Sequence, residues 1–217
     1  MPRKPATPGV DSRQQILEAA LEIFAEQGFE AATNKAIADR AGLNQGLIYF
    51  YFASKADVYF ATFAFHTEQL LAQLDVIFER EGDTDPADGL ERLLKQIVLI
   101  LSAPPANHLL RIMYQSFGSR TPPGELSNQD DRQAIGGLAK YLNLRLRKYL
   151  TAQISRGGFR TMNPGLVANL MMRSLIVIAG IPRRDDNRQP DPDVLAETMA
   201  ELYCYGLLPR EGDTTPE

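Results

Sequence analysis

Apolar residues recur every three to four positions through nearly the whole sequence, and no run of alternating β-branched residues interrupts them. This spacing gathers apolar side chains on one face of an α-helix, whereas a half-buried strand alternates them at every second position. The chain has 217 residues, enough to bury a large core. The pattern therefore predicts an all-α fold of about nine helices.

The composition is typical of a soluble globular protein, with 44% apolar and 23% charged residues. No apolar run approaches the roughly 20 residues of a membrane span. The N-terminal residues lack the apolar region of a secretory signal. The single cysteine, Cys204, excludes an internal disulfide and fits a reducing compartment. We therefore expect a cytoplasmic protein without a membrane partner.

The formal net charge of −4 counts against a nucleic-acid-binding protein if the charge is spread evenly. Residues 1–55, however, carry six basic and six acidic residues, so the excess negative charge lies in residues 56–217. Glu18, Glu22 and Glu26 recur every four residues and share one helix face. That face is expected to point away from any polyanion bound by this part of the chain.

Residues 33–52, "TNKAIADRAGLNQGLIYFYF", predict two short helices joined by a tight turn. Thr33 and Asn44 are suitable N-cap residues for helices over residues 34–41 and 45–51. Gly42 permits the sharp turn between them. Two short helices with a glycine-containing turn of three to four residues are typical of the helix-turn-helix motif.

The second helix carries polar and apolar residues that a buried hairpin does not explain. Residues 44–47, "NQGL", stand at its N-terminal end, the part of a recognition helix that meets base edges in the major groove. A glutamine pairs with adenine through two hydrogen bonds, and an apolar side chain contacts a thymine methyl. Hydroxyl groups and a cation suited to phosphates come from Thr33, Tyr49, Tyr51 and Lys55.

The segment "RQQILEAALEIFAEQGFEAATNKAIADRAGLNQGLIYFYFASKADVY" closely resembles the DNA-binding domain of the tetracycline-repressor (TetR) family of bacterial regulators. The resemblance covers about residues 11–65 and includes Gly28, Ile37, Gly42 and Lys55 at the family spacing. It implies that Lys35 and Gln45 contact bases. The residues then expected to bind DNA are Thr33, Lys35, Asn44, Gln45, Gly46, Leu47, Tyr49, Tyr51 and Lys55.

The sequence also departs from the family at the DNA-facing positions. Many members carry Ser or Thr where Asn44 stands, a polar residue in place of Leu47, and His in place of Tyr51. The operator of a relative therefore does not predict the operator of this chain.

The resemblance further implies a domain organisation. Residues 10–70 would form the DNA-binding domain with its motif at about 33–52, residues 71–208 a ligand-binding and dimerisation domain, and residues 1–9 and 209–217 flexible tails. Such a homodimer would bind a palindromic operator on double-stranded DNA and be released by a small apolar or amphipathic effector, as a repressor. An activator, or a regulator without small-molecule control, remains the alternative.

Two further sets of residues follow from this organisation. Methionines and aromatics suit an adaptable apolar pocket, although at helical spacing they also suit a plain core. The candidate pocket residues are Phe63, His66, Leu70, Met113, Tyr114, Phe117, Tyr141 and Met171. The candidate dimer residues, on two apolar helices near the C-terminus, are Leu170, Leu175, Ile178, Leu195, Met199 and Leu202.

Two other classes of protein compete with a regulator. No nucleophile elbow, phosphate loop or paired carboxylate motif indicates an enzyme. His66 and His108 are far apart in sequence, with no further His or Cys near either, so neither a metal site nor a cofactor is expected. A helical protein-interaction module without DNA binding would leave Gln45 and Lys55 unexplained.

Overall fold

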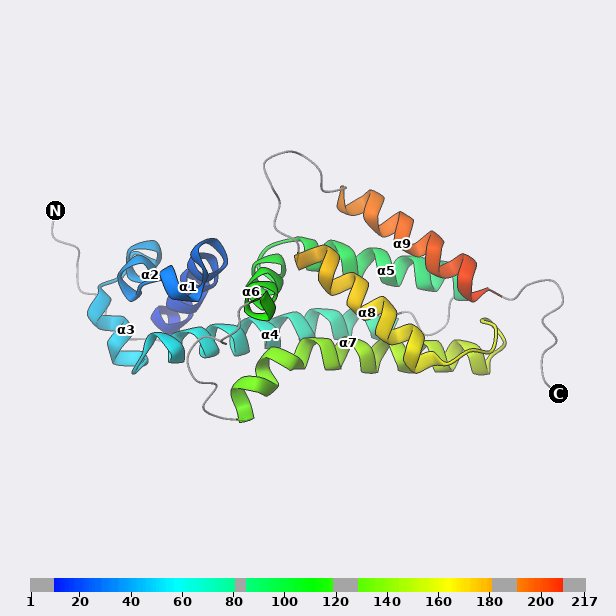
Figure 1. Cartoon of the computed structure of the whole chain (residues 1–217), viewed down its shortest axis with the longest axis horizontal. Coiled ribbons are helices and arrows are strands. Elements are labelled where there is room, and N and C mark those ends of the chain that lie inside the picture. The colour runs from blue at the N-terminus through cyan, green and yellow to red at the C-terminus, as the bar shows by residue number, and fades with distance from the viewer. Residues whose placement is uncertain (1–9, 81–84, 119–128, 181–190, 209–217) are drawn as a thin grey trace. The chain divides into compact units, whose positions relative to one another are not determined.

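The computed structural model describes residues 10–80, 85–118, 129–180 and 191–208 of the chain (Figure 1). Within these residues the secondary structure consists of nine helices and no strands, so the all-α prediction is confirmed. The helices are α1 (Val10–Ala31), α2 (Asn34–Ala41), α3 (Gln45–Tyr51), α4 (Lys55–Arg80), α5 (Pro86–Ser102), α6 (Ala106–Gly118), α7 (Gln129–Ser155), α8 (Pro164–Gly180) and α9 (Pro192–Leu207). The expected tails at 1–9 and 209–217 lie outside the described residues.

The short helices begin and end where local side-chain chemistry dictates. Thr33 Oγ1 accepts a hydrogen bond from the Ala36 amide at 3.1 Å, and Asn44 Oδ1 accepts one from the Gly46 amide at 2.8 Å. Each N-cap satisfies an amide that has no partner within its helix. Gly42 ends α2 with φ of 71°, a left-handed conformation that favours glycine.

Helix α1 begins at Val10 and is kinked near its C-terminal end. Gly28 leaves the helical conformation there, with φ of 77° and ψ of 169°. One further turn follows, however, to Ala31. The helix is therefore kinked at Gly28 but does not end there, because tertiary contacts of residues 29–32 hold the extra turn.

The chain divides into two compact units, and the first comprises Met1–Gln69 and His108–Gly136. In this unit the Phe24 ring of α1 lies edge-on to the Tyr59 ring of α4, with the centroids 5.1 Å apart. The α6 segment joins the same unit, whereas the sequence placed it in the second domain. One reason is the side-chain amide of Gln115, which donates to the Ala25 carbonyl of α1 at 3.3 Å.

The second unit comprises Leu70–Asn107 and Gly137–Glu217. Within it α5 packs along α9 and also against α8. Gly158, in the segment after α7, packs against Pro86 at the start of α5. A side chain at position 158 would collide with the Pro86 ring. The Arg160 amide then donates to the Leu207 carbonyl at 2.9 Å, which joins the segment after α7 to the end of α9.

Candidate nucleic-acid interface

Helices α2 and α3 form a helix-turn-helix with a small apolar core. Ile37 and Ile48 are completely buried, and Ala38 and Leu43 are buried beside them. The Leu43 amide donates to the Ala38 carbonyl at 2.9 Å, which closes the turn after α2. One face of α3 is therefore fixed by packing, and the opposite face is free to meet another molecule.

The exposed face of α3 is defined by the residues Gln45, Gly46, Tyr49 and Phe50, and we refer to it as the recognition face. The Tyr49 and Phe50 side chains are 57% and 67% exposed, although large aromatic residues usually lie in the core. Gly46 and Phe50 stand one helical turn apart, so they share this face. A helix with one locked side and one exposed apolar side fits a groove-binding element.

The sequence did not predict Phe50 and placed Leu47 on the recognition face instead. The structure leaves Leu47 and Tyr51 half-buried, on the edge of α3 between the core and the recognition face. The rings of Phe50 and Tyr51 stand edge to face, with the centroids 5.1 Å apart. The helical spacing of four residues from Gly46 to Phe50 was the sequence signal that could have placed Phe50 on the recognition face.

Besides Arg40, two cations in this part of the chain have exposed side chains. Lys35 stands in the first turn of α2, beside the exposed cap residue Thr33. Arg13 in α1 places its guanidinium 5.5 Å from the centroid of the Phe52 ring at the end of α3. The sequence did not single out Arg13 as a candidate, because 39 positions separate it from Phe52 and no local spacing links them.

The sequence predicted that the Lys55 ammonium group faces outward to a phosphate, but in the structure it points to the end of α1. Its Nζ donates to the carbonyls of Phe29 at 2.7 Å, Glu30 at 3.1 Å and Ala32 at 3.0 Å. The same nitrogen lies 4.5 Å from the centroid of the Phe29 ring. The ammonium group has three donors, and all three are occupied by the end of α1 rather than available to a phosphate.

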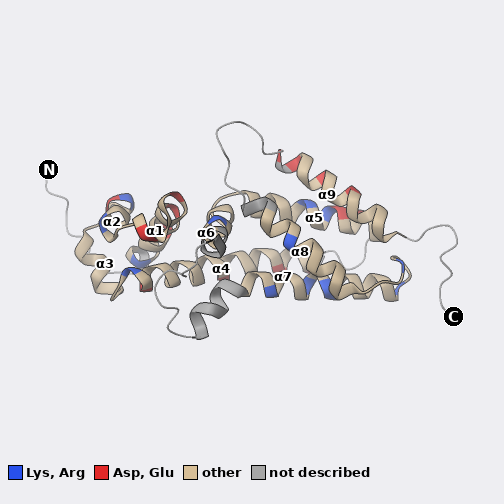
Figure 2. Cartoon of the chain, in the orientation of Figure 1, with Lys and Arg blue, Asp and Glu red and all other residues tan. Residues whose placement is uncertain are grey.

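The acidic face of α1 is partly neutralised by a residue of α2 (Figure 2). The Arg40 guanidinium lies 2.6 Å from Glu22 and 2.8 Å from Glu26, measured between nitrogen and carboxylate oxygen. The hydrogen bond from Arg40 lowers the pKa of Glu26 below its usual value. These bonds join α2 to α1 and reduce the repulsion that two glutamates would exert on a nearby polyanion.

The residues expected to line a pocket are divided between the two units. Phe63, His66 and Met113 are buried in the first unit, whereas Leu70, Tyr141 and Met171 belong to the second. The side chains of Tyr114 and Phe117 lie outside the described residues.

Tyr141 has a specific role within the second unit. Its hydroxyl donates to Asp75 Oδ1 at 2.6 Å, and the Arg145 guanidinium lies 2.9 Å from the same oxygen. Burial, together with this hydrogen bond to a carboxylate, raises the pKa of the Tyr141 hydroxyl. Tyr141 thus joins α7 to α4.

A group of buried polar atoms lies within the first unit. His66 is 4% exposed, and its Nε2 lies 3.3 Å from the Leu17 carbonyl. Three buried nitrogens, His66 Nδ1, His108 Nδ1 and Arg111 Nε, have no hydrogen-bond partner among the described residues. Burial lowers the pKa of His66, so its neutral form is favoured. Nitrogens left without partners in a buried environment are suited to a polar group of a ligand or to water.

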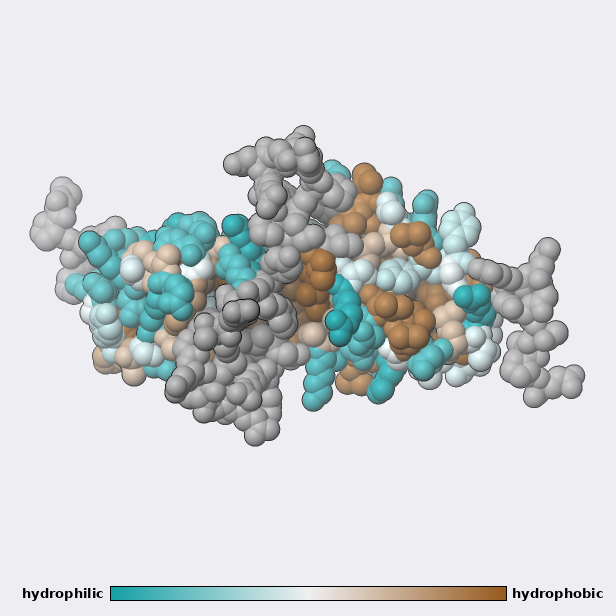
Figure 3. Space-filling model, viewed as in Figure 1, coloured by the Kyte–Doolittle hydropathy of each residue, from teal (hydrophilic) through white to brown (hydrophobic). Residues whose placement is uncertain are grey.

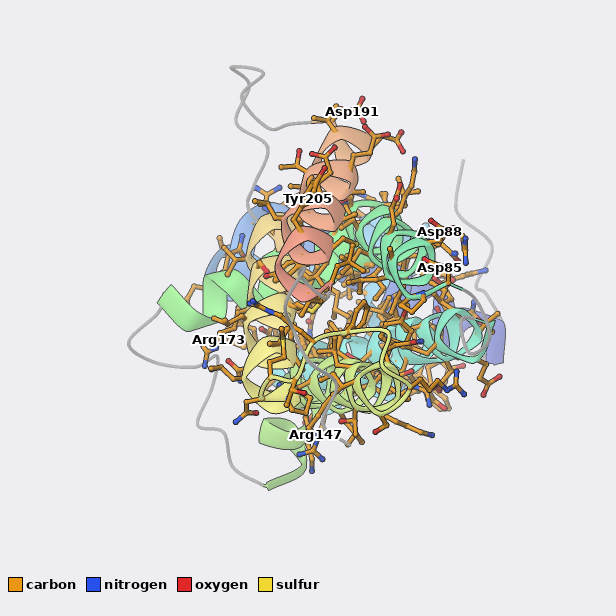
Figure 4. The ribbon with its side chains drawn as sticks, turned by 90° about the vertical axis from the view of Figure 1, so that its right-hand side faces the viewer. Asp85, Asp88, Arg147, Arg173, Asp191 and Tyr205 are labelled. Atoms are coloured by element: carbon orange, nitrogen blue, oxygen red, sulfur yellow. The ribbon has the colours of Figure 1, made fainter. Side chains whose placement is uncertain are left out.

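Helices α8 and α9 expose apolar residues that a folded monomer would ordinarily bury (Figure 3). Ser174 and Tyr203 hydroxyls lie 2.7 Å apart, so the two helices are neighbours. The exposed residues are Leu166, Leu170 and Val177 on α8 and Val194, Leu202 and Tyr205 on α9, and we refer to them as the apolar stripe. Figure 4 shows Tyr205 on α9 and the exposed Arg173 on α8 in a view along this unit.

The dimer residues expected from the sequence fall partly on the apolar stripe. Leu170 and Leu202 belong to it, and Leu195 is half-buried. Leu175 and Met199 are instead buried inside the unit, because they occupy the opposite sides of their helices. The side chain of Ile178 lies outside the described residues.

Comparison with known proteins agrees with this geometry. Residues 16–62 match the model of bacterial regulatory proteins of the tetR family. The fatty acid metabolism regulator protein of Bacillus subtilis is 32% identical over 194 residues, which cover 89% of this chain and 94% of that protein. The chain belongs to the TetR family.

Other TetR-family proteins align over shorter lengths. The regulator SrpR of Pseudomonas putida is 35% identical over 101 residues, which cover 46% of this chain and only 43% of that protein. The matched region therefore spans less than half of this relative.

Solved structures of TetR-family regulators share the fold over most of the chain. FadR from Bacillus halodurans, a fatty acid degradation regulator, superposes with a TM-score of 0.69 at 26% identity and covers 93% of this chain and 98% of its own. FadR from Bacillus subtilis, solved in complex with stearoyl-CoA, gives 0.67 at 23% identity, with 89% and 98% covered. The likeness to the B. subtilis structure, at 23% identity, establishes the fold alone.

Two further observations concern the described residues of this TetR-family chain. None of their helices is long and apolar enough to span a membrane. No group of three or more His, Cys, Asp and Glu side chains gathers among them as metal ligands would. The curated relatives are transcriptional regulators, a class that acts by binding rather than by catalysis.

Proposed function

We propose that this TetR-family regulator is a repressor that inserts the recognition face of α3 into the major groove of an operator. The exposed aromatic pair Tyr49–Phe50, on a helix whose other side packs into the core through the completely buried Ile48, is the observation that supports this most strongly. Gln45, at the N-terminal end of α3, is the residue proposed to pair with a base. A protein of this kind works where bacterial DNA lies, in the cytoplasm.

The phosphate contacts are proposed for residues around α3. Thr33 and Lys35 lie at the start of α2, where unpaired amides and the helix dipole also attract anions. Arg13 adds a cation near the C-terminal end of α3. Asn44 serves mainly as the cap of α3, because its side-chain oxygen is already bonded to the Gly46 amide.

The dimer is proposed to form through the apolar stripe of α8 and α9. Residues at positions 166, 170 and 177 recur at helical spacing on α8, as do 194, 202 and 205 on α9. A two-fold axis brings the apolar stripes of two subunits together, so each apolar residue occurs twice in the interface. A dimer would present two α3 helices to half-sites about one DNA turn, or 34–36 Å, apart.

The effector is proposed to be a fatty acyl thioester. The B. subtilis relative that aligns over nearly its full length is a fatty acid metabolism regulator, and the B. halodurans structure is a fatty acid degradation regulator. The unpartnered nitrogens of His66, His108 and Arg111 are candidates to bind its polar end within the first unit. Only a ligand that prefers the non-binding state releases the operator.

The DNA proposal is tested by in vitro selection of bound fragments from random DNA, followed by affinity measurements on single-base variants of the selected operator. Gln45→Ala should cost about 1–3 kcal/mol per contacted base pair and relax preference at that position. Gln73, an exposed glutamine of α4 in the second unit, supplies the control, and Gln73→Ala should bind as the wild type does. Wild-type affinity of Gln45→Ala for the best operator, with the base preference unchanged at every position, would contradict the assigned role.

The effector proposal has a separate test. Stearoyl-CoA, the ligand of the B. subtilis FadR structure, is titrated into the operator complex beside free CoA and stearate. Stearoyl-CoA should release the operator, whereas CoA alone should not. If no acyl-CoA of any chain length releases the operator, the effector proposal fails and the DNA proposal stands.

A further inference from the structure

Lys55 stands at an unfavourable position in its own helix. It is the first residue of α4, directly after Ser54, whose hydroxyl accepts a hydrogen bond from the Asp57 amide at 3.1 Å. The amides of a first helical turn create positive potential, so a cation there is disfavoured. The position of this lysine therefore needs an explanation outside α4.

The explanation lies at the end of α1. After the kink at Gly28, the last turn of α1 presents carbonyls that have no amide to pair with inside the helix. The Lys55 ammonium binds two of these, on Phe29 and Glu30, and the carbonyl of Ala32 directly after the helix, at 2.7 to 3.1 Å, and two of the three bonds are partly buried. A cation at the C-terminal end of a helix also interacts favourably with its dipole. The Phe29 ring, 4.5 Å away, adds a cation–π contact.

We infer that Lys55 is a positioning residue of the DNA-binding unit and does not grip a phosphate. Residues 33–52, which form the helix-turn-helix, lie between the last turn of α1 and the first turn of α4. Lys55 bonds these two turns to each other and so fixes both ends of the segment that carries the recognition face. This inference rests on the proposed binding of DNA through α3.

Lys35 provides the matched contrast within the same unit. Its side chain is exposed, and among the described residues it forms no hydrogen bond or ion pair. Its three donors are therefore available to a phosphate. Removing the charge of Lys35 should affect counterion release, whereas removing that of Lys55 should affect geometry.

The first experiment compares Lys55→Met with Lys35→Met in the full chain. Methionine keeps an unbranched apolar stem and removes the charge. Operator affinity is measured at several salt concentrations, at a temperature where circular dichroism shows every variant to be folded. Each lost phosphate contact lowers the slope of log K against log salt by about 0.9, or about 1.8 for a dimer.

Lys55→Met should bind the operator at least about tenfold more weakly with an unchanged salt slope, because small displacements of a recognition element are costly. Lys35→Met should lower the slope and leave the unfolding temperature unchanged. A slope lowered by Lys55→Met would show a phosphate contact and overturn the inference. If folded Lys55→Met bound the operator with unchanged affinity, Lys55 would only stabilise the fold, and the inference would be overturned as well.

A second measurement uses the wild-type protein, so it stays decisive even if Lys55→Met does not fold. Lysine amines are acetylated with acetic anhydride, and mass spectrometry gives the rate for each residue. Lys55 should react slowly in the free protein and equally slowly with operator bound, whereas Lys35 should be fast alone and slowed by operator. A Lys55 that reacts as fast as Lys35 and is protected only by operator would contradict the inference. If the wild type binds no selected DNA, the proposed function fails, and slow acetylation of free Lys55 still reports its bonds to α1.

Discussion

Substitution of Leu202 provides a quantitative test of the apolar stripe. Leu202 is 69% exposed on α9, so most of its side chain has no contact within its own subunit. Complete burial of a leucine side chain is worth about 1.5–3 kcal/mol, and burial of this exposed part is therefore worth about 1–2 kcal/mol. A two-fold interface contains the residue twice, so Leu202→Ala should cost about 2–4 kcal/mol per dimer.

This cost corresponds to a dimer dissociation constant raised about 30- to 700-fold, because each 1.4 kcal/mol is a factor of ten. Sedimentation velocity over a dilution series of the free protein measures that constant directly. Val76→Ala is the matched control, since Val76 is an exposed apolar residue on α4, outside α8 and α9. Normal dimerisation of Leu202→Ala together with weakened dimerisation of Val76→Ala would refute the placement of the interface on the apolar stripe.

Three further predictions follow from single residues. Gly158→Ala should destabilise the protein by about 1–3 kcal/mol in urea unfolding, because the new methyl group meets the Pro86 ring, whereas Gly137→Ala, with nothing within 4 Å, should not. Phe50→Ala should weaken operator binding by about 1–2 kcal/mol per half-site without lowering the unfolding temperature, and replacing a contacted thymine by deoxyuracil should weaken the wild type but not the variant. The free energy of unfolding should fall as the pH drops below 6.5, the pKa of His66 in the unfolded chain, because the unfolded chain then binds a proton that the buried ring resists. His66→Gln should reduce the slope of the unfolding free energy against pH.

Local features of the fold were predictable from the sequence. Thr33, Gly42 and Asn44 determine the ends of α2 and α3 through bonds to residues two to four positions away. Such interactions are encoded in short spacings, which a single sequence displays. The helix-turn-helix and the all-α class follow from them and from the apolar periodicity.

The tertiary features were not predictable in the same way. Lys55 bonds to carbonyls 23 to 26 positions earlier in the chain, and nothing in its local spacing indicates those partners. The same distant contacts explain why α1 continues beyond Gly28. The sequence also did not distinguish Leu202, which is exposed, from Met199, which is buried, because both lie on one apolar helix and only packing decides which side faces α5.

The discontinuous first unit limits how this regulator can be recombined with others. Gln115 of α6 bonds to Ala25 of α1, although 90 positions separate them. A chimeric protein joined after residue 69 would pair its α1 with an α6 from a different parent and would lose matched contacts at that surface. Exchange of operator preference is therefore better achieved by transplanting the few exposed side chains of α3, and a natural crossover that preserves function would have to carry α6 together with α1.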